Sequence, residues 1–598
     1  MHIKTNSMKD FIKTLFATAF GFCLYSIIAI VVVFVAFMTL IGWGDEKPIV
    51  PESTILSVNM SKFILMEQTT EPDFLTLLQD DGTGASFIGI HDAIKAINTA
   101  ASDPSVSMIY LQADMAMGGI SQIEEFRSAL ENFRQSGKPI VAYVENPTNA
   151  GMYLASASDR VYMTPYCGNM NLFTGISSQM VFLKDLLDKL GINVQLIRHG
   201  KYKSAGEMFI NSAPSDENME QNQSMVESIW KNWSTAIAES RNMRAERLNT
   251  LLEDLELKSS EDFMYYGLVD ELITSQELHS KLAYLSGLGN GNINFTAFAD
   301  YELARRPEEI VVDQNKIAVV FLEGEIIDGF SYDQISADRF VKILSDIRHD
   351  PSVKATVIRI NSPGGSVHAA EKILAEIELL QQQMPVIASY GDYAASGGYW
   401  ISAGCDKIYS NASTLTGSIG VFSMVPDFSQ TLNDKLHVNI VSVNSNKHAD
   451  MYNMMRPLED EEILFMQSTV EDTYERFISL VAKGRNLDKD YVEEIAQGRI
   501  WSGSDALEIG LVDEIGTIDD AVYFAVNSIS SEVDPETLII ESYPLPLSDW
   551  EMFFSELDGT ENILADTPFK NIGEAFQSWT SAQAGKAYAR IPYEYIIR

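Results

Sequence analysis

The sequence predicts an α/β protein in which two tandem copies of one domain, each with a mostly parallel sheet and flanking helices, follow one N-terminal transmembrane helix. Short β-branched runs alternate with helical patterns along the chain, which is typical of βαβ units. Several segments recur in the same order in the two halves. The first residues contain a long, uncharged apolar stretch.

The tandem copies are indicated by segments that recur at nearly constant spacing. Asp103–Val106 recurs as Asp350–Val353, 247 residues later, and Gly267–Glu271 recurs as Gly510–Glu514, 243 residues later. Spacing this long indicates two fused domains rather than a solenoid of short repeats.

The N-terminal apolar stretch runs from about Leu15 to Trp43 without a charge, which exceeds the roughly 20 residues needed to cross a bilayer. Because the run continues to Trp43, it favours a retained anchor over a cleaved signal peptide. Lysines such as Lys13 precede it and Asp45 follows it. The positive flank is expected in the cytoplasm, with the body of the protein on the other side of the membrane.

The first copy begins with a predicted strand at Ser53–Val58, and a Gly118-Gly119 turn leads into a helix. The buried face of that helix is expected to carry Ile123, Phe126, Leu130 and Phe133. A run rich in Gly and Asn at 286–294 marks the join to the second copy.

The second copy has predicted strands at Ile317–Leu322 and Ala355–Ile360, a turn at Gly364-Gly365, and a helix from Val367. A further strand, Pro385–Tyr390, leads to Ser396. Strand, glycine turn, helix and strand form a βαβ unit, whose ligand site is expected at the carboxyl ends of the strands.

These patterns divide the chain into five parts: a cytoplasmic tail (1–14), a transmembrane helix (15–43), a first repeat (44–295), a second repeat (296–532) and a C-terminal extension (533–598). The extension has no counterpart in the first copy by sequence. Its scattered aromatic side chains are expected to pack on the body of the protein or on a partner.

Charge and cysteine content limit the classes of partner and site that the sequence can be expected to have. The formal net charge of −40 argues against nucleic acid as a partner, and acidity spread over both copies is typical of a solubilising surface. The three cysteines, Cys23, Cys167 and Cys405, have no spacing typical of a metal site or disulfide framework. The cysteines therefore predict neither a metal site nor a disulfide framework.

Ser396 lies in the segment Gly391–Trp400, where small residues on both sides allow a turn that exposes a hydroxyl. This setting favours a nucleophile for acyl transfer, although a serine that caps a helix would also fit. Aligning Tyr153 with Tyr399 sets Ala150 opposite Ser396. Only the second copy is then expected to carry the nucleophile.

A serine hydroxyl needs a base to become a good nucleophile. None of the eight histidines lies in a pattern typical of a catalytic triad, and His368 is expected to be an exposed residue of a first helical turn. A lysine is the other candidate, provided that burial lowers its pKa.

Several motifs together resemble the signal peptide peptidase A family, also called protease IV, of the long, membrane-anchored, tandem-domain type. Besides the N-terminal apolar stretch, they are His199–Ala205, Asn361–Ser366, Gly391–Trp400, Ser413–Gly420 and Gly498–Gly503. The resemblance covers nearly the whole chain. It implies a fold similar to Clp protease and crotonase, and a catalytic pair of serine and lysine.

Carried over residue by residue, the resemblance implies Ser396 as nucleophile, Lys203 as general base and Ser418 as the serine that orients the lysine. It also implies backbone amides of Gly365 and Gly397 as oxyanion donors. Two such donors are expected to lower the barrier by several kcal/mol.

Lys447 is a rival base within the chain. It follows Ser396 by 51 residues, and Lys203 follows Ala150 by 53, so spacing alone pairs Ser396 with Lys447. The family assembles its site across a domain junction, which favours Lys203. Lys447 and Lys201 are then expected to be surface residues.

The resemblance implies a membrane-anchored serine endopeptidase that degrades remnant signal peptides and other short apolar peptides. It would act on the periplasmic side of a bacterial inner membrane, as a homotetramer and without a cofactor. Two other classes remain open: a crotonase-like enzyme acting on acyl-CoA, and a catalytically inactive scaffold.

Overall fold

The computed structural model describes residues 47–69, 86–166, 171–286, 293–306, 315–529, 538–545 and 586–591, together with Lys13, Thr18, Gly21, Phe22, Tyr25 and Ile28, which are helical. Residues 1–50 form one compact unit and residues 51–598 another. The predicted transmembrane segment 15–43 lies almost wholly outside the described residues. Among those that are described, no helix is both long enough and apolar enough to span a bilayer.

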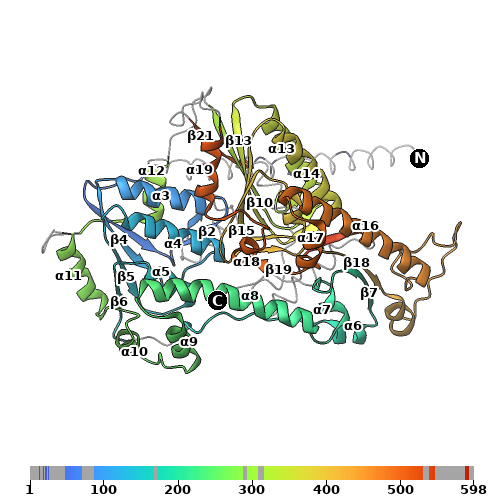
Figure 1. The fold of residues 1–598 in the computed structure, drawn as a ribbon, viewed down its shortest axis with the longest axis horizontal. Helices are drawn as coiled ribbons and strands as arrows, with labels where there is room; N and C mark the ends of the chain where they lie inside the picture. The colour runs from blue at the N-terminus through green and yellow to red at the C-terminus, as the bar shows by residue number, and fades with distance from the viewer. Residues whose placement is uncertain are drawn as a thin grey trace, which may run out of the picture. The chain divides into compact units, whose positions relative to one another are not determined.

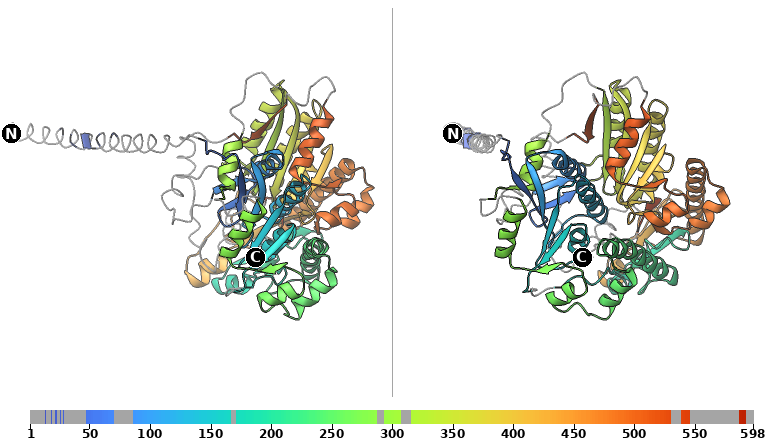
Figure 2. Two further views of the ribbon diagram at one scale, coloured as in Figure 1. Left: turned by 90° about the vertical axis from the view of Figure 1, so that its left-hand side faces the viewer. Right: turned by 60° about the vertical axis from the view of Figure 1, so that its left-hand side comes forward.

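The first sheet is parallel throughout, in the order β8-β6-β5-β4-β1-β9. Its strands are β1 (Thr54–Asn59), β4 (Val106–Gln112), β5 (Ile140–Val144), β6 (Arg160–Met163), β8 (Glu271–Leu272) and β9 (Phe295–Ala297). Helix α11 (Ser275–Leu285) covers one face, and α3 (Ile90–Ser102) and α4 (Ile120–Arg134) cover the other (Figure 2). The buried positions of α4 include the four apolar residues that its periodicity predicts.

The second sheet repeats this plan in the order β20-β16-β15-β13-β10-β21, all parallel. Two further strands extend it: β17 runs parallel to the end of β15, and β19 runs antiparallel to β17. Its strands are β10 (Lys316–Glu323), β13 (Val353–Ser362), β15 (Val386–Ala395), β16 (Lys407–Ser410), β17 (Leu415–Gly417), β19 (Ile500–Ser502), β20 (Glu514–Ile515) and β21 (Ile539–Tyr543). Its principal helices are α13 (Ala337–His349), α14 (Val367–Gln381), α15 (Gly397–Ser402), α18 (Gly503–Glu508) and α19 (Ile518–Ser528). The predicted α/β class with mostly parallel sheets is confirmed.

The edges of the two sheets differ from the sequence-based division. β9 contains the expected boundary at 295/296, yet it pairs with β1, so these residues belong to the first sheet. β21 lies in the expected C-terminal extension but pairs with β10 in the same parallel way. The prediction that the extension has no counterpart in the first copy is therefore wrong for β21. Three-residue strands such as β9 carry too little local pattern to reveal this.

A third sheet, in the order β12-β11-β14-β22-β18-β7, joins the two copies. Its strands are β7 (Asn193–His199), β11 (Ile326–Ile327), β12 (Ile335–Ser336), β14 (Gly364–Ser366), β18 (Val421–Asp427) and β22 (Tyr588–Arg590). β7 of the first copy runs antiparallel to β18 of the second (Figure 1). This pairing brings the chain after His199 to the carboxyl edge of the second sheet.

The other elements complete the two copies. They are β2 (Phe63–Met66), β3 (Ser86–Gly89), α5 (Asn149–Ser156), α6 (Lys184–Leu190), α7 (Glu207–Ile210), α8 (Asp216–Ser240), α9 (Ala245–Glu253), α10 (Ser260–Tyr265), α12 (Phe298–Arg305), α16 (Asp460–Arg485), α17 (Lys489–Ile495) and a π-helical turn at Thr431–Lys435.

A buried arginine that pairs with two carboxylates holds the first copy against the second. Arg359 on β13 is fully buried; its Nε lies 2.7 Å from Glu67 and its Nη1 lies 2.7 Å from Glu125 on α4. Nearby, the Ser121 hydroxyl donates to Asp392 at 2.6 Å. Removing one partner of such a pair leaves an uncompensated buried charge, so these contacts hold the copies in one arrangement.

Candidate active site

Ser396 occupies a strained turn between β15 and α15. Its φ of 56° and ψ of −108° are unfavourable for a residue with a side chain, and its N–H donates to Gly417 O at 2.8 Å. Its side chain makes no capping hydrogen bond to the helix. The alternative of a helix-capping serine is therefore excluded.

Lys203 reaches Ser396 from the first copy. Its Nζ lies 2.8 Å from Ser396 Oγ, 3.0 Å from Ser418 Oγ and 3.2 Å from Ser418 O. Only 1% of Lys203 is exposed, and burial lowers the pKa of its amine well below the ordinary value. An amine that is neutral at working pH can accept the proton of a hydroxyl.

The backbone around Lys203 is held from several sides. Arg198 Nη1 donates to Lys203 O at 2.7 Å and to Glu207 Oε1 at 2.9 Å. Gly498, with φ at 77°, packs so closely that a Cβ there would lie 2.7 Å from both the N and the Cβ of Lys203. A Cβ at Gly420 would lie 3.2 Å from Lys203 Cδ. Glycine is therefore the residue that fits at 498.

Ser418 lies on the turn between β17 and β18, where its φ is 49° and its N–H donates to Arg499 O at 2.7 Å. The turn presents both the hydroxyl and the carbonyl oxygen of Ser418 to the Lys203 amine. These two contacts hold the amine beside Ser396.

The backbone amides of Gly365 and Gly397 lie next to each other with no side chain between them. A Cβ at Gly397 would lie 3.1 Å from Gly365 N, and a Cβ at Gly364 would lie 2.8 Å from Gly397 N. Gly364 and Gly365 have φ values of 104° and 155°, which favour glycine. The two N–H groups can thus serve one oxygen atom.

The rival bases lie elsewhere. Lys447 is on the surface, with 57% of its side chain exposed, and its Nζ lies 2.6 Å from Glu461, which raises the pKa of the amine. His368 and Lys201 are exposed, as predicted. The pairing of Ser396 with Lys447 that sequence spacing suggests is therefore wrong.

The first copy has a different turn at the equivalent place. α5 begins at Asn149, so Ala150 lies inside the helix, and the residue just before the helix is Thr148. In the second copy the residue just before the helix is Ser396. In the structure, Thr148 is therefore the equivalent of Ser396, and the sequence alignment that set Ala150 opposite Ser396 was off by two residues.

Residues 132–289 and 378–529 match the pattern of Peptidase family S49, one match in each copy. The chain belongs to peptidase family S49. It is 36% identical to Protease 4 of Haemophilus influenzae over 75% of this chain and 74% of that protein. It is 34% identical to Protease 4 of Salmonella typhi over 72% of this chain and 71% of that protein. A putative signal peptide peptidase SppA of Enterococcus faecium is 36% identical over 38% of this chain and 68% of that protein.

Family S49 membership confirms the predicted class, because the chain is a serine protease and hence a hydrolase. The interpretation as an acyl-CoA enzyme is not supported. Within this S49 chain, sequence reasoning missed the groups that support Lys203, namely Arg198, Glu207 and the close approach of Gly498. Gly420 ends the motif Ser413–Gly420 and Gly498 begins the motif Gly498–Gly503. Their place in these motifs was the sequence signal that could have identified them.

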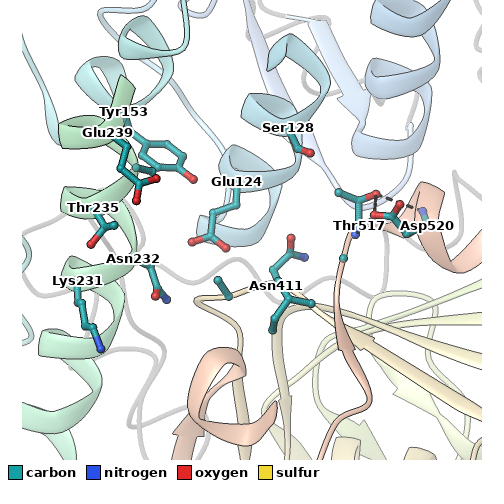
Figure 3. Close-up of a pocket in the computed structure, with 14 residues that line it drawn as sticks. Glu124, Ser128, Tyr153, Lys231, Asn232, Thr235, Glu239, Asn411, Thr517 and Asp520 are labelled. Carbon is teal, nitrogen blue, oxygen red and sulfur yellow. Dashed lines mark hydrogen bonds between the residues drawn. The ribbon is translucent and has the colours of Figure 1, made fainter. Parts of the chain in front are cut away.

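A cavity of about 530 Å³ lies away from the serine of this S49 protease, between α4, α5 and α8 on one side and residues 411–412 and 515–520 on the other (Figure 3). Glu124 and Asn411 line it, and burial raises the pKa of the Glu124 carboxyl group to about 7. Ser396, Lys203 and Ser418 are not among its lining residues. The cavity is therefore separate from the Ser396 site.

Proposed function

We propose that this chain is a serine endopeptidase that works by a dyad of Ser396 and Lys203. The observation that carries the proposal is the 2.8 Å contact between Ser396 Oγ and a fully buried lysine amine. A Clp protease or crotonase-like fold of each copy is part of the proposal. It is supported by the glycine turn and the serine turn at the carboxyl edge of one parallel sheet.

In this mechanism Ser396 Oγ attacks the carbonyl carbon of a peptide bond while Lys203 Nζ takes the hydroxyl proton. The amides of Gly365 and Gly397 donate to the developing oxyanion, and Ser418 positions the amine. The proton then passes to the leaving nitrogen. Water, activated by the same amine, hydrolyses the acyl-enzyme and frees Ser396.

The proposed substrates are remnant signal peptides and other short apolar peptides. Two observations support this substrate class. The Enterococcus relative is described as a putative signal peptide peptidase. In this chain, an apolar cluster includes Met208 and Phe209 of α7 and Phe422 of β18, and β18 is separated by one strand, β22, from the strand that carries the glycine turn.

The proposed location is a bacterial inner membrane, with an anchor at 15–43, the N-terminus in the cytoplasm and the body on the periplasmic side. This proposal rests on the uncharged length of the segment and on the lysines before it. No nucleic acid, metal or cofactor enters the proposed reaction.

A homotetramer is also proposed, and one surface supports association between copies of the chain. Residues 436–443 contain five apolar side chains, are exposed and form no described strand; Val441 is 84% exposed and Val443 is 97% exposed. By sequence, residues 436–443 are the second copy's equivalent of β7: an Asp-Lys-Leu run that ends at Leu190 precedes β7, and the same run occurs at 434–436. Residues 175–181 occupy the place of β18 in the first copy and form no described strand. Because β7 pairs with β18 within the chain, residues 436–443 are suited to pair in the same way with residues 175–181 of a second chain.

Replacement of Ser396 by alanine tests the dyad. Ser396→Ala is expected to abolish hydrolysis of an apolar reporter peptide by the purified full chain while its circular dichroism spectrum is unchanged. Ser423→Ala is the matched control, because Ser423 is also buried and its Oγ has no hydrogen-bond partner among the described residues. Near-normal turnover by Ser396→Ala would disprove the proposal.

A further inference from the structure

β22, from the C-terminal part of the chain, lies directly beside the proposed oxyanion glycines. It runs antiparallel to β14, with Ala589 opposite Gly365 and Arg590 opposite Gly364. On its other side it meets β18, where Tyr588 pairs with Phe422. The chain's own segment therefore fills the slot between β14 and β18.

The backbone of the segment is bound as an added strand. Ile591 N donates to Pro363 O at 2.9 Å and Val367 N donates to Ala587 O at 3.3 Å, one bond on each side of the Ala589 position. Main-chain bonds of this kind bind an extended peptide regardless of its sequence. The slot is thus a general binding site for an extended peptide.

The carbonyl group of Ala589 lies where the carbonyl group of a reacting peptide would be expected. A Cβ at Gly364 would lie 2.0 Å from Ala589 O, and a Cβ at Gly397 would lie 3.2 Å from it. The same two glycines flank the Gly365 and Gly397 amides described above. A substrate carbonyl cannot enter this position while Ala589 is there.

Side chains of the segment also find complementary surroundings. Tyr588 is buried in the apolar cluster formed by α6, α7 and β18, and its ring centroid lies 6.1 Å from that of Phe422. Lys586 Nζ lies 2.8 Å from Asp328 and Arg590 Nη1 lies 3.0 Å from Glu325. Aromatic burial and two ion pairs add to the backbone bonds.

We propose that residues 586–591 are a resident competitor of the substrate, bound in the peptide slot with Ala589 at the oxyanion position. The proposal rests on the Ser396 and Lys203 dyad. It adds that the enzyme is inhibited by its own C-terminal segment and that an external peptide must displace this segment to react.

The test compares the full chain with a variant that lacks residues 586–598 and with Tyr588→Ser. An apolar reporter peptide is expected to show an apparent KM about tenfold lower with either variant, since a tethered competitor acts at an effective concentration in the millimolar range. Tyr523→Ser is the control, because Tyr523 is 70% exposed on α19. The expected kcat is unchanged.

A free hexapeptide with the sequence of Lys586–Ile591 is expected to inhibit the truncated enzyme competitively. The same peptide with tryptophan in place of the residue equivalent to Ala589 is expected not to inhibit, because Ala589 is fully buried. Equal KM values for the full chain, the truncated enzyme and Tyr588→Ser would overturn the proposal. If those enzymes remain dependent on Ser396, that result leaves the dyad intact.

Discussion

The turns from β5 to α5 and from β15 to α15 occupy the same place in the two copies but use a hydroxyl differently. Thr148 is extended, with φ at −119°, and its side chain accepts from Gly151 N at 2.9 Å. Ser396 is strained, with φ at 56°, and its hydroxyl contacts Lys203 instead of the helix.

The difference shows what a nucleophile requires of its backbone. A hydroxyl that caps a helix is bound to an amide of the first turn, whereas a hydroxyl that is to react must be free of the helix and held beside a base. Strain of this kind costs about 1–3 kcal/mol and persists only where the surroundings impose it. The first copy avoids that cost and, through the pairing of β7 with β18, contributes Lys203, the proposed base, to the other copy.

Among the tests of this difference between the copies, replacement of Lys203 is expected to have the largest effect on kcat. Lys203→Ala is expected to lower kcat by a factor of about 10²–10⁴, the usual contribution of a general base. Lys447→Ala is the matched control and is expected to leave kcat unchanged, because Lys447 pairs with surface glutamates. Steady-state hydrolysis of one peptide by both variants decides this, and the reverse ranking would mean that each copy completes its own site.

The pH dependence sharpens the same point. Burial lowers the pKa of Lys203, so the neutral amine becomes abundant only as pH rises through that lowered pKa. We expect kcat/KM to rise about tenfold per pH unit below the pKa and to level off above it. A rate that does not change with pH, under conditions where chemistry limits turnover, would argue against a lysine base.

Ser418→Ala removes an orienting contact rather than a reacting atom. We expect kcat to fall by roughly ten- to a hundredfold, as the loss of about 1.4–2.7 kcal/mol would give. The pH profile is also expected to shift, because Ser418 Oγ contacts the amine at 3.0 Å. A purely structural role would change thermal stability and leave the profile where it was.

Gly498→Ala tests how closely the two copies approach. A Cβ there would press on Lys203, whereas at Gly510, which has a similar φ of 79°, it would meet only Leu487 at 3.5 Å. Both variants are expected to lose roughly 1 kcal/mol of stability from the positive φ. Only Gly498→Ala is expected to lower kcat, by about tenfold or one to two kcal/mol. Equal kcat values for the two variants would show that the close approach of Gly498 does not determine the position of Lys203.

Thr148→Ala should have the smallest effect. It removes a helix cap, worth about 1 kcal/mol, from a turn with no proposed role in chemistry. We expect the midpoint of thermal unfolding to fall by about 2–4 °C and kcat/KM to be unchanged. Any large loss of activity would show that the first copy's turn takes part in the reaction.

Local pattern was sufficient for much of the fold. The alternation of β-branched runs with helices such as Val367–Gln381 predicts the two parallel sheets, because each of these elements buries a periodic face. The third sheet could not be predicted. β22 has three residues, and its partners lie more than 150 residues away, so no local property of the sequence selects them.

The site shows the same limit. Small residues around Ser396 indicate an exposed hydroxyl, but spacing favoured Lys447, because it does not reveal that β7 crosses to β18. That pairing places Lys203 beside Ser396, 193 residues away in the chain. The catalytic roles of these residues stay predictions until the variants are measured.

The crossing of β7 to β18 also bears on the time at which proteolysis can begin. The ribosome releases the amine of Lys203 long before the hydroxyl of Ser396, and neither half-chain holds both. Docking through the buried Arg359 must follow synthesis of the second copy. A nascent chain therefore cannot assemble the proposed pair of Ser396 and Lys203 before the second copy has been made and has docked.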